Sequence, residues 1–204
     1  MLLIPLVLSL SVHEWAHAAA ARVLGDDTAE RLGRLTLNPI SHIDPIGTIL
    51  LPMLGIPFGW AKPVPFNPIR FKRKYSMTTG TMLVAIAGPI SNIVIAVISL
   101  FFLALLSPGN VQISTASSAI VTLLHSLIFL NILLACFNMI PVPPLDGSYV
   151  ADAFMPKALR PYWEAFRSLG YGALLFILIG PLLLGINLFH WPMEVVGYLI
   201  GVVN

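Results

Sequence analysis

The sequence has few charged residues, a single cysteine and no pattern typical of a nucleic-acid-binding patch. Only 10% of its 204 residues are Asp, Glu, Lys or Arg, whereas hydrophobic residues make up 57%. A soluble domain carries about 25% charged residues, so water cannot be the solvent for most of this surface, and we predict an integral membrane protein. The single cysteine, Cys136, excludes an intrachain disulfide and a metal site built from several thiolates. With only 11 basic residues in the chain, we expect no nucleic-acid partner.

Long apolar runs occupy most of the chain, and basic residues gather between them. The runs that we predict to cross the membrane or to lie along it cover residues 4–24, 81–106, 119–140, 171–188 and 192–203. Basic residues cluster at 61–75 and 155–167, whereas the loop at 107–117 has none, so the positive-inside rule places the two clusters in the cytoplasm. We expect an all-α multi-pass protein of the cell membrane, with one domain over residues 1–204 and a bundle of about five to six transmembrane segments.

A shorter apolar run at residues 46–60 is interrupted by helix-breaking residues. These are Gly47, Pro52, Gly55, Pro57 and Gly59. About fifteen residues are too few for an ordinary span. Non-helical backbone at membrane depth is tolerated only where protein or a water-filled cavity surrounds it. We therefore predict a re-entrant extended segment that packs on the first span.

Ionisable residues lie in the middle of the first apolar run, in the stretch HEWAH at 13–17. Burying such a cluster in hydrocarbon costs several kcal/mol, so an intramembrane cluster indicates function. Residues i and i+4 share a helix face, so His13 and His17 can direct their ring nitrogens at one metal ion, with Glu14 beside it as base for a water. Two histidines and one carboxylate favour zinc, at one Zn²⁺ per chain. The alternative is a polar network between helices.

Two acidic residues, Asp44 and Asp146, are the candidates for a third ligand. Asp44 lies in a turn with His42, where an aspartate commonly bonds its own backbone. Asp146 ends the stretch FNMIPVPPLDG, whose prolines interrupt an apolar helix and imply a polar cavity, so we favour it. Asn138, in the same stretch, is a candidate hydrogen-bond donor to a developing oxyanion, an interaction that can contribute about 3 kcal/mol. A helix-capping or interhelical hydrogen bond is its alternative.

Three separated motifs, in this order, resemble those of the site-2 protease family of intramembrane zinc metalloproteases. They are HEWAH, GWAKPVPFNP at 59–68, and the asparagine-to-LDG stretch at 138–147. GPISN at 88–92 also resembles the Gly-x-x-x-Asn helix of that family, where small residues permit close packing. The resemblance covers most of the chain and implies a compact form without PDZ or CBS domain. It further implies roles for these site residues: His13, His17 and Asp146 bind zinc, Glu14 is the catalytic base, and Asn138 lies near the oxyanion.

The resemblance implies a zinc metalloendopeptidase that cleaves membrane-spanning substrate segments, with Glu14 as base for a metal-activated water. The expected partners are a transmembrane protein substrate and the lipid bilayer, and the active site lies toward the cytoplasmic side. The stretch from Gly47 to Gly59 is a candidate edge to which an unwound substrate adds as a strand. His42 is a further candidate for the site, and an interfacial histidine bonded to a turn is its alternative. The oligomeric state is not predicted.

Two other classes of function compete with proteolysis. A zinc transporter would also use intramembrane His and Asp, but it needs ligands at successive depths, and His125 and His190 have no acidic neighbour that completes a second cluster. A catalytically inactive scaffold is expected to have lost the glutamate or a ligand. Because Glu14 is present, and metal binding alone does not need a base, the sequence favours catalysis.

Overall fold

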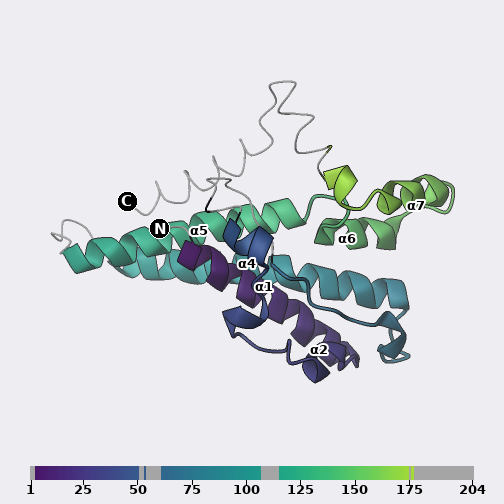
Figure 1. The fold of residues 1–204 in the computed structure, drawn as a ribbon, viewed down its shortest axis with the longest axis horizontal. Coiled ribbons are helices and arrows are strands. Elements are labelled where there is room, and N and C mark those ends of the chain that lie inside the picture. The colour runs from purple at the N-terminus through teal and green to yellow at the C-terminus, as the bar shows by residue number, and fades with distance from the viewer. Residues whose placement is uncertain (1–2, 51–52, 54–60, 107–114, 175, 177–204) are drawn as a thin grey trace.

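The protein is built from three long helices, and several of its shorter helices lie toward one end of the molecule (Figure 1). A computed structural model describes residues 3–50, 53, 61–106, 115–174 and 176. Within these ranges the chain forms helices, turns and loops, and no strand, so the prediction of an all-α fold is confirmed for them. The elements are α1 (Leu3–Leu24), α2 (Thr28–Arg31), η1 (Pro39–Ser41), η2 (Pro45–Leu50), η3 (Pro68–Arg70), α4 (Met77–Leu106), α5 (Thr115–Asn138), α6 (Asp146–Phe154) and α7 (Arg160–Ser168).

Among the described helices, α4 and α5 are long and apolar enough to cross a membrane. Mean hydropathy reaches 2.5 in α4 and 2.3 in residues 119–138 of α5. At about 1.5 Å per residue, α4 is about 45 Å long, which exceeds the hydrocarbon thickness of a bilayer. Large apolar side chains such as Ile93, Val97 and Phe101 are exposed on α4. An outward face of this kind suits lipid better than water.

Helix α1 packs along α4 and also contacts α5 (Figure 1). Small side chains permit the close approach, since Ala21 of α1 is fully buried in a cluster that includes Val84 of α4. The polar residues Ser9, Ser11, His13, Glu14 and His17 of α1 are all buried. Helix α1 therefore directs its ionisable residues into the protein.

A non-helical segment, residues 61–67, packs against α1. Asp26, which is fully buried just after α1, accepts hydrogen bonds from the N–H groups of Thr28 and Asn67. Val64 is buried in a cluster with Ala residues of α1 and α2. These contacts hold residues 61–67 beside the ionisable part of α1.

The predicted re-entrant segment is only partly described. Its first part, Pro45–Leu50, forms a helical turn instead of an extended strand. The Gly47 N–H donates to the Asp44 Oδ1 at 2.7 Å, so the carboxylate satisfies a backbone donor at the beginning of this turn and favours the helical conformation. Residues 51–52 and 54–60, including Gly59, lie outside the described residues, as do residues 107–114, 175 and 177–204. The loop was predicted at 107–117, but its last three residues belong to α5, which begins at Thr115.

Candidate metal centre and active site

His13 and His17 face each other across one turn of α1. Their ring centroids are 4.6 Å apart and their Nε2 atoms 3.0 Å apart. The helical period produces this arrangement, because positions i and i+4 share a face. Trp15, between them, is directed outward and is 36% exposed. The i,i+4 prediction for the two histidines therefore describes their positions correctly.

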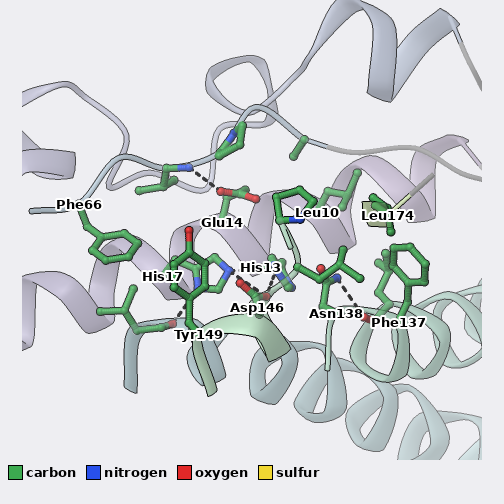
Figure 2. A pocket seen from close by; sticks show the side chains of 18 of the residues that line it. Leu10, His13, Glu14, His17, Phe66, Phe137, Asn138, Asp146, Tyr149 and Leu174 are labelled. Carbon is green, nitrogen blue, oxygen red and sulfur yellow. Dashed lines mark hydrogen bonds and ion pairs between the residues drawn. The ribbon is translucent and has the colours of Figure 1, made fainter. Parts of the chain in front are cut away.

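Asp146 reaches the two histidines from a distant part of the chain. It is the first residue of α6, after a proline-containing turn that follows α5. Its Oδ2 lies 3.2 Å from His13 Nε2 and 3.4 Å from His17 Nε2. Figure 2 shows the three side chains converging on one point. The other candidate, Asp44, lies in its turn and accepts from the Gly47 N–H.

The separations among these three atoms fit a tetrahedral metal. Bond lengths of about 2.0–2.1 Å to zinc place neighbouring tetrahedral ligands about 3.3 Å apart. The Nε2 and Oδ2 atoms of His13, His17 and Asp146 lie 3.0, 3.2 and 3.4 Å apart. Asp146 Oδ2 is buried and has no hydrogen-bond partner. Three ligands leave one tetrahedral position open, as catalytic zinc sites require.

The second ring nitrogen of each histidine contacts an oxygen of α4. His13 Nδ1 hydrogen-bonds the Asn92 side-chain oxygen, and His17 Nδ1 lies 2.8 Å from the Val84 carbonyl. Such partners orient metal-binding histidines and select the tautomer that leaves Nε2 unprotonated. Two unprotonated nitrogens and a carboxylate facing one another repel unless a cation lies between them. The donor set thus fits a divalent metal.

Glu14 lies beside the ligands but points toward residues 61–67. Its Oε2 accepts a hydrogen bond of 2.8 Å from the Val64 N–H (Figure 2). The carboxylate is buried, and it is not one of the three converging ligands. Glu14 is therefore placed next to a metal position without occupying it, which is the arrangement that a general base requires.

One cavity of about 200 Å³ is lined by all four ionisable residues, which are His13, Glu14, His17 and Asp146. This volume is ample for more than one water molecule. Most of its wall is apolar or aromatic, and Phe66 and Tyr149 line it on the side of His17 (Figure 2). A peptide bond that enters this cavity leaves bulk water behind.

Of the other predicted site residues that the structure describes, one lines the cavity and two do not. Asn138 lines the cavity, but its Nδ2 donates to the Leu134 carbonyl at 3.0 Å, so one of its two hydrogens already has a partner within α5. His42 is buried outside the cavity lining, with Nε2 2.8 Å from the Thr36 carbonyl, as the alternative of a turn-bonded histidine describes. Gly47 is also absent from the cavity lining.

Sequence reasoning missed two partners of the site. The Val84 carbonyl belongs to the backbone, so no side-chain pattern marks it. Asn131 contacts Asn92, which is the partner of His13. A signal for Asn131 was available, since an amide in the middle of the apolar run at 119–140 is expensive to bury without a function or a partner.

Replacing Gly147 with Ala should destabilise the protein and weaken the metal site. A Cβ atom there would overlap the backbone carbonyls of Met139 and Ile140, which cannot move without shifting the turn that precedes Asp146. Overpacking of this kind costs about 1–3 kcal/mol, which corresponds to a fall in Tm of several degrees. Thermal unfolding in detergent, with and without zinc, measures the effect. Gly172→Ala is the control, because a Cβ there meets open space; equal Tm values for the two variants would contradict the prediction.

Comparisons with known proteins agree on one family. Residues 108–180 match the family model of Peptidase family M50. The chain is 41% identical to the Bacillus subtilis protein named "Putative zinc metalloprotease YwhC" over 182 residues, which are 89% of this chain and 81% of that protein. It is 32% identical over 196 residues to the Mycobacterium tuberculosis protein named "Putative zinc metalloprotease Rip2", covering 95% of this chain and 70% of that protein. No solved structure matches the chain.

Proposed function

The chain belongs to Peptidase family M50, and from this premise we propose that it is a zinc metalloendopeptidase that hydrolyses peptide bonds of membrane-spanning substrates. The observation that carries the proposal is the convergence of His13, His17 and Asp146 on one point of a cavity that Glu14 also lines. The ligand types and their separations suit zinc.

The residues of the cavity divide the chemistry between them. When bound by His13, His17 and Asp146, zinc supplies a Lewis acid that lowers the pKa of a water to about 7 and polarises a carbonyl group. Glu14 accepts a proton from the attacking water and returns it to the leaving amine. Its Oε2 is oriented by the Val64 N–H, and Oε1 is then the oxygen that exchanges the proton.

Asn138 is proposed to stabilise the oxyanion. Its amide has two hydrogens, and the bond to the Leu134 carbonyl engages one of them. The second hydrogen is available to a carbonyl oxygen of the substrate, because Asn138 lines the same cavity as the ligands. A donor of this kind contributes about 3 kcal/mol to the transition state.

The proposed setting is the cytoplasmic side of a multi-pass membrane protein with about five to six transmembrane segments. In support, the C-terminal ends of α1 and α5, the beginning of α4, and α6 with α7 lie toward the same end of the molecule (Figure 1). The two basic clusters at 61–75 and 155–167 lie at these helix ends. Basic residues mark the cytoplasmic side. A transmembrane protein substrate would thus present an unwound end of its helix to the cavity. The strand-addition edge expected at residues 47–59 cannot include residues 47–50, because they form a helical turn.

Metal content and cleavage test this function together. Purified wild type should contain one zinc per chain, and it should cleave a model membrane substrate in a reaction that a chelator stops and added zinc restores. His13→Ala and Asp146→Ala should each lose the zinc, because a pair of ligands holds it too weakly. Asp44→Ala is the matched control, since that carboxylate lies in a turn with the Gly47 N–H. Elemental analysis gives the stoichiometry.

Three results would contradict parts of the proposal. Zinc retained in Asp146→Ala and lost in Asp44→Ala would identify Asp44, instead of Asp146, as the third ligand. If the wild-type protein contains no metal, the cluster is instead a polar network between helices. Zinc transport into proteoliposomes without cleavage would indicate a transporter, although within the described residues this is the only group of three such ligands.

A further inference from the structure

A row of three buried polar side chains extends from His13 away from the cavity. Asn92 of α4, Asn131 of α5 and Ser9 of α1 are each 0% exposed. None of them lines the cavity. An amide left without partners in such a position costs about 1–3 kcal/mol. Because their surroundings are apolar helix interfaces, these residues need a reason beyond packing.

The orientation of the Asn131 amide follows from two fixed acceptors. The Leu127 carbonyl can only accept, and it lies 2.8 Å from one terminal atom of Asn131, which must therefore be the nitrogen Nδ2. Ser9 uses its single hydroxyl hydrogen for the Pro5 carbonyl at 2.7 Å, so toward the same Nδ2, at 2.8 Å, its oxygen must accept. Both hydrogens of Nδ2 are thus engaged, and Asn131 Oδ1 must face the other way.

This orientation passes from one amide to the next and reaches the metal ligand. Asn131 Oδ1 lies 2.7 Å from Asn92, whose facing atom must be the donor Nδ2. Asn92 Oδ1 then faces His13 Nδ1, which must carry the proton. His13 Nε2 is left with a lone pair directed at His17 Nε2 and Asp146 Oδ2. A neutral imidazole with this tautomer is the form that binds zinc.

We propose that Asn131, supported by Ser9, is a positioning residue that selects the metal-binding tautomer of His13 through Asn92. The inference rests on the proposed function, because it assumes that His13 Nε2 binds zinc. His17 has no comparable side-chain row, since its Nδ1 faces the Val84 backbone carbonyl, which is always an acceptor. An asparagine can present either end of its amide, so only His13 needs a second residue to determine which end faces it.

Loss of Asn131 should act on the metal, even though Asn131 does not touch it. Without the Asn131 oxygen, Asn92 Nδ2 has no acceptor, and the amide gains by turning its N–H toward His13 Nδ1. The His13 proton then moves to Nε2, which must lose it again before binding zinc. Zinc affinity falls by the free energy of restoring the original tautomer.

Zinc affinity in three variants tests the inference. Asn131→Leu replaces the amide with an apolar side chain of similar size. It should lower zinc affinity about 10- to 100-fold, the range found for outer partners of metal-binding histidines. Ser9→Ala removes one of the two acceptors and should lower it less. Ser11→Ala is the matched control, because Ser11 is a buried serine of α1 that also donates to the carbonyl four residues earlier, Val7, and has no bond to Asn131.

Two readouts are needed, and neither is catalytic activity. Competition with a chelator, in detergent, gives the zinc affinity of each variant. The visible spectrum of the Co²⁺-loaded protein reports ligand geometry, and it should change in Asn131→Leu and stay unchanged in Ser11→Ala. Thermal unfolding in excess chelator confirms that each metal-free variant is folded. If Asn131→Leu does not fold, Ser9→Ala against Ser11→Ala decides the question.

Each remaining outcome counts against one specific statement. Equal zinc affinity in wild type, Asn131→Leu and Ser9→Ala would overturn the inference and leave the proposed function intact. An equal loss in Ser9→Ala and Ser11→Ala would assign the effect to the packing of α1, and this also overturns it. Wild type that binds zinc in the expected way but cleaves no substrate would refute the protease proposal while the affinity comparison still stands. Wild type without zinc would refute both.

Discussion

Gly88→Ala should give a protein that no longer binds zinc and no longer cleaves substrate. Gly88 lies on α4 directly against the two ligand histidines, and a Cβ there would lie 2.5 Å from His17 Nε2 and 2.6 Å from His13 Cε1. Both rings would have to move by several tenths of an ångström, whereas metal–ligand distances tolerate only about 0.2 Å. We expect zinc affinity to fall by more than about 100-fold, beyond the usual effect of an outer partner.

Gly80→Ala provides the control for this variant. Gly80 lies on the same helix, two turns earlier, and a Cβ there would overlap the buried ring of Phe71, which is not among the residues that line the cavity. Both variants gain the same helix propensity, so a difference between them reports what the methyl group contacts. Zinc content and cleavage should be lost in Gly88→Ala and retained in Gly80→Ala. A Gly88→Ala protein with full zinc content would show that the rings lie elsewhere in solution.

The sequence predicts the relative positions of two proposed metal ligands because these positions depend on local geometry. The helical period places His13 and His17 on one face, and that relation needs no tertiary information. Asp146 was preferred over Asp44 on the polarity of its surroundings, and the structure brings it within 3.4 Å of both histidines. Glu14 follows from the same helix, although its partner, the Val64 N–H, could not be predicted.

Relations between distant segments could not be predicted, because no local period links them. Ser9 and Asn131 are 122 positions apart, and only the packing of α1 against α5 brings them into contact. The close approach at Gly88 depends equally on the spacing of α1 and α4. The first part of the predicted re-entrant segment was expected to be extended, but a hydrogen bond from the Gly47 N–H to the Asp44 side chain favours a helical turn. A side-chain hydrogen bond to the backbone can thus favour a helical turn where Gly and Pro residues predict extended backbone.

Helix α1 combines two functions that a single face could not provide. His13 and His17 point toward α4 and α6, where rigid partners from both helices surround them. Glu14 is one position farther around the helix and meets residues 61–67 instead. Glu14, the proposed base, is therefore held by a loop, and the proposed ligands are held by helices. A substrate that displaces residues 61–67 would change the position of the base without moving the metal.

Glu14→Gln should abolish cleavage and leave zinc binding unchanged. Within the described lining of the cavity, Glu14 and Asp146 are the only carboxylates, and Asp146 is the proposed third metal ligand. Glutamine keeps the size of the side chain, and its amide oxygen still accepts the Val64 N–H, but it cannot take a proton from water. A positioned general base contributes about 10²–10⁴ in rate, so kcat should fall by that factor. Kinetics with a model membrane substrate, at full zinc content, measures it.

Glu30→Gln is the matched control for loss of a carboxylate. Glu30 lies on α2, where it pairs with Arg22 at the surface, and this pair contributes little to stability. Cleavage by Glu30→Gln should equal that of wild type. If Glu14→Gln keeps its zinc and cleaves within about tenfold of wild type, some other group takes the proton, because removing a true base costs at least about 10². If it loses zinc, the negative charge of Glu14 supports metal binding, because the substitution keeps an acceptor for the Val64 N–H and removes only the charge.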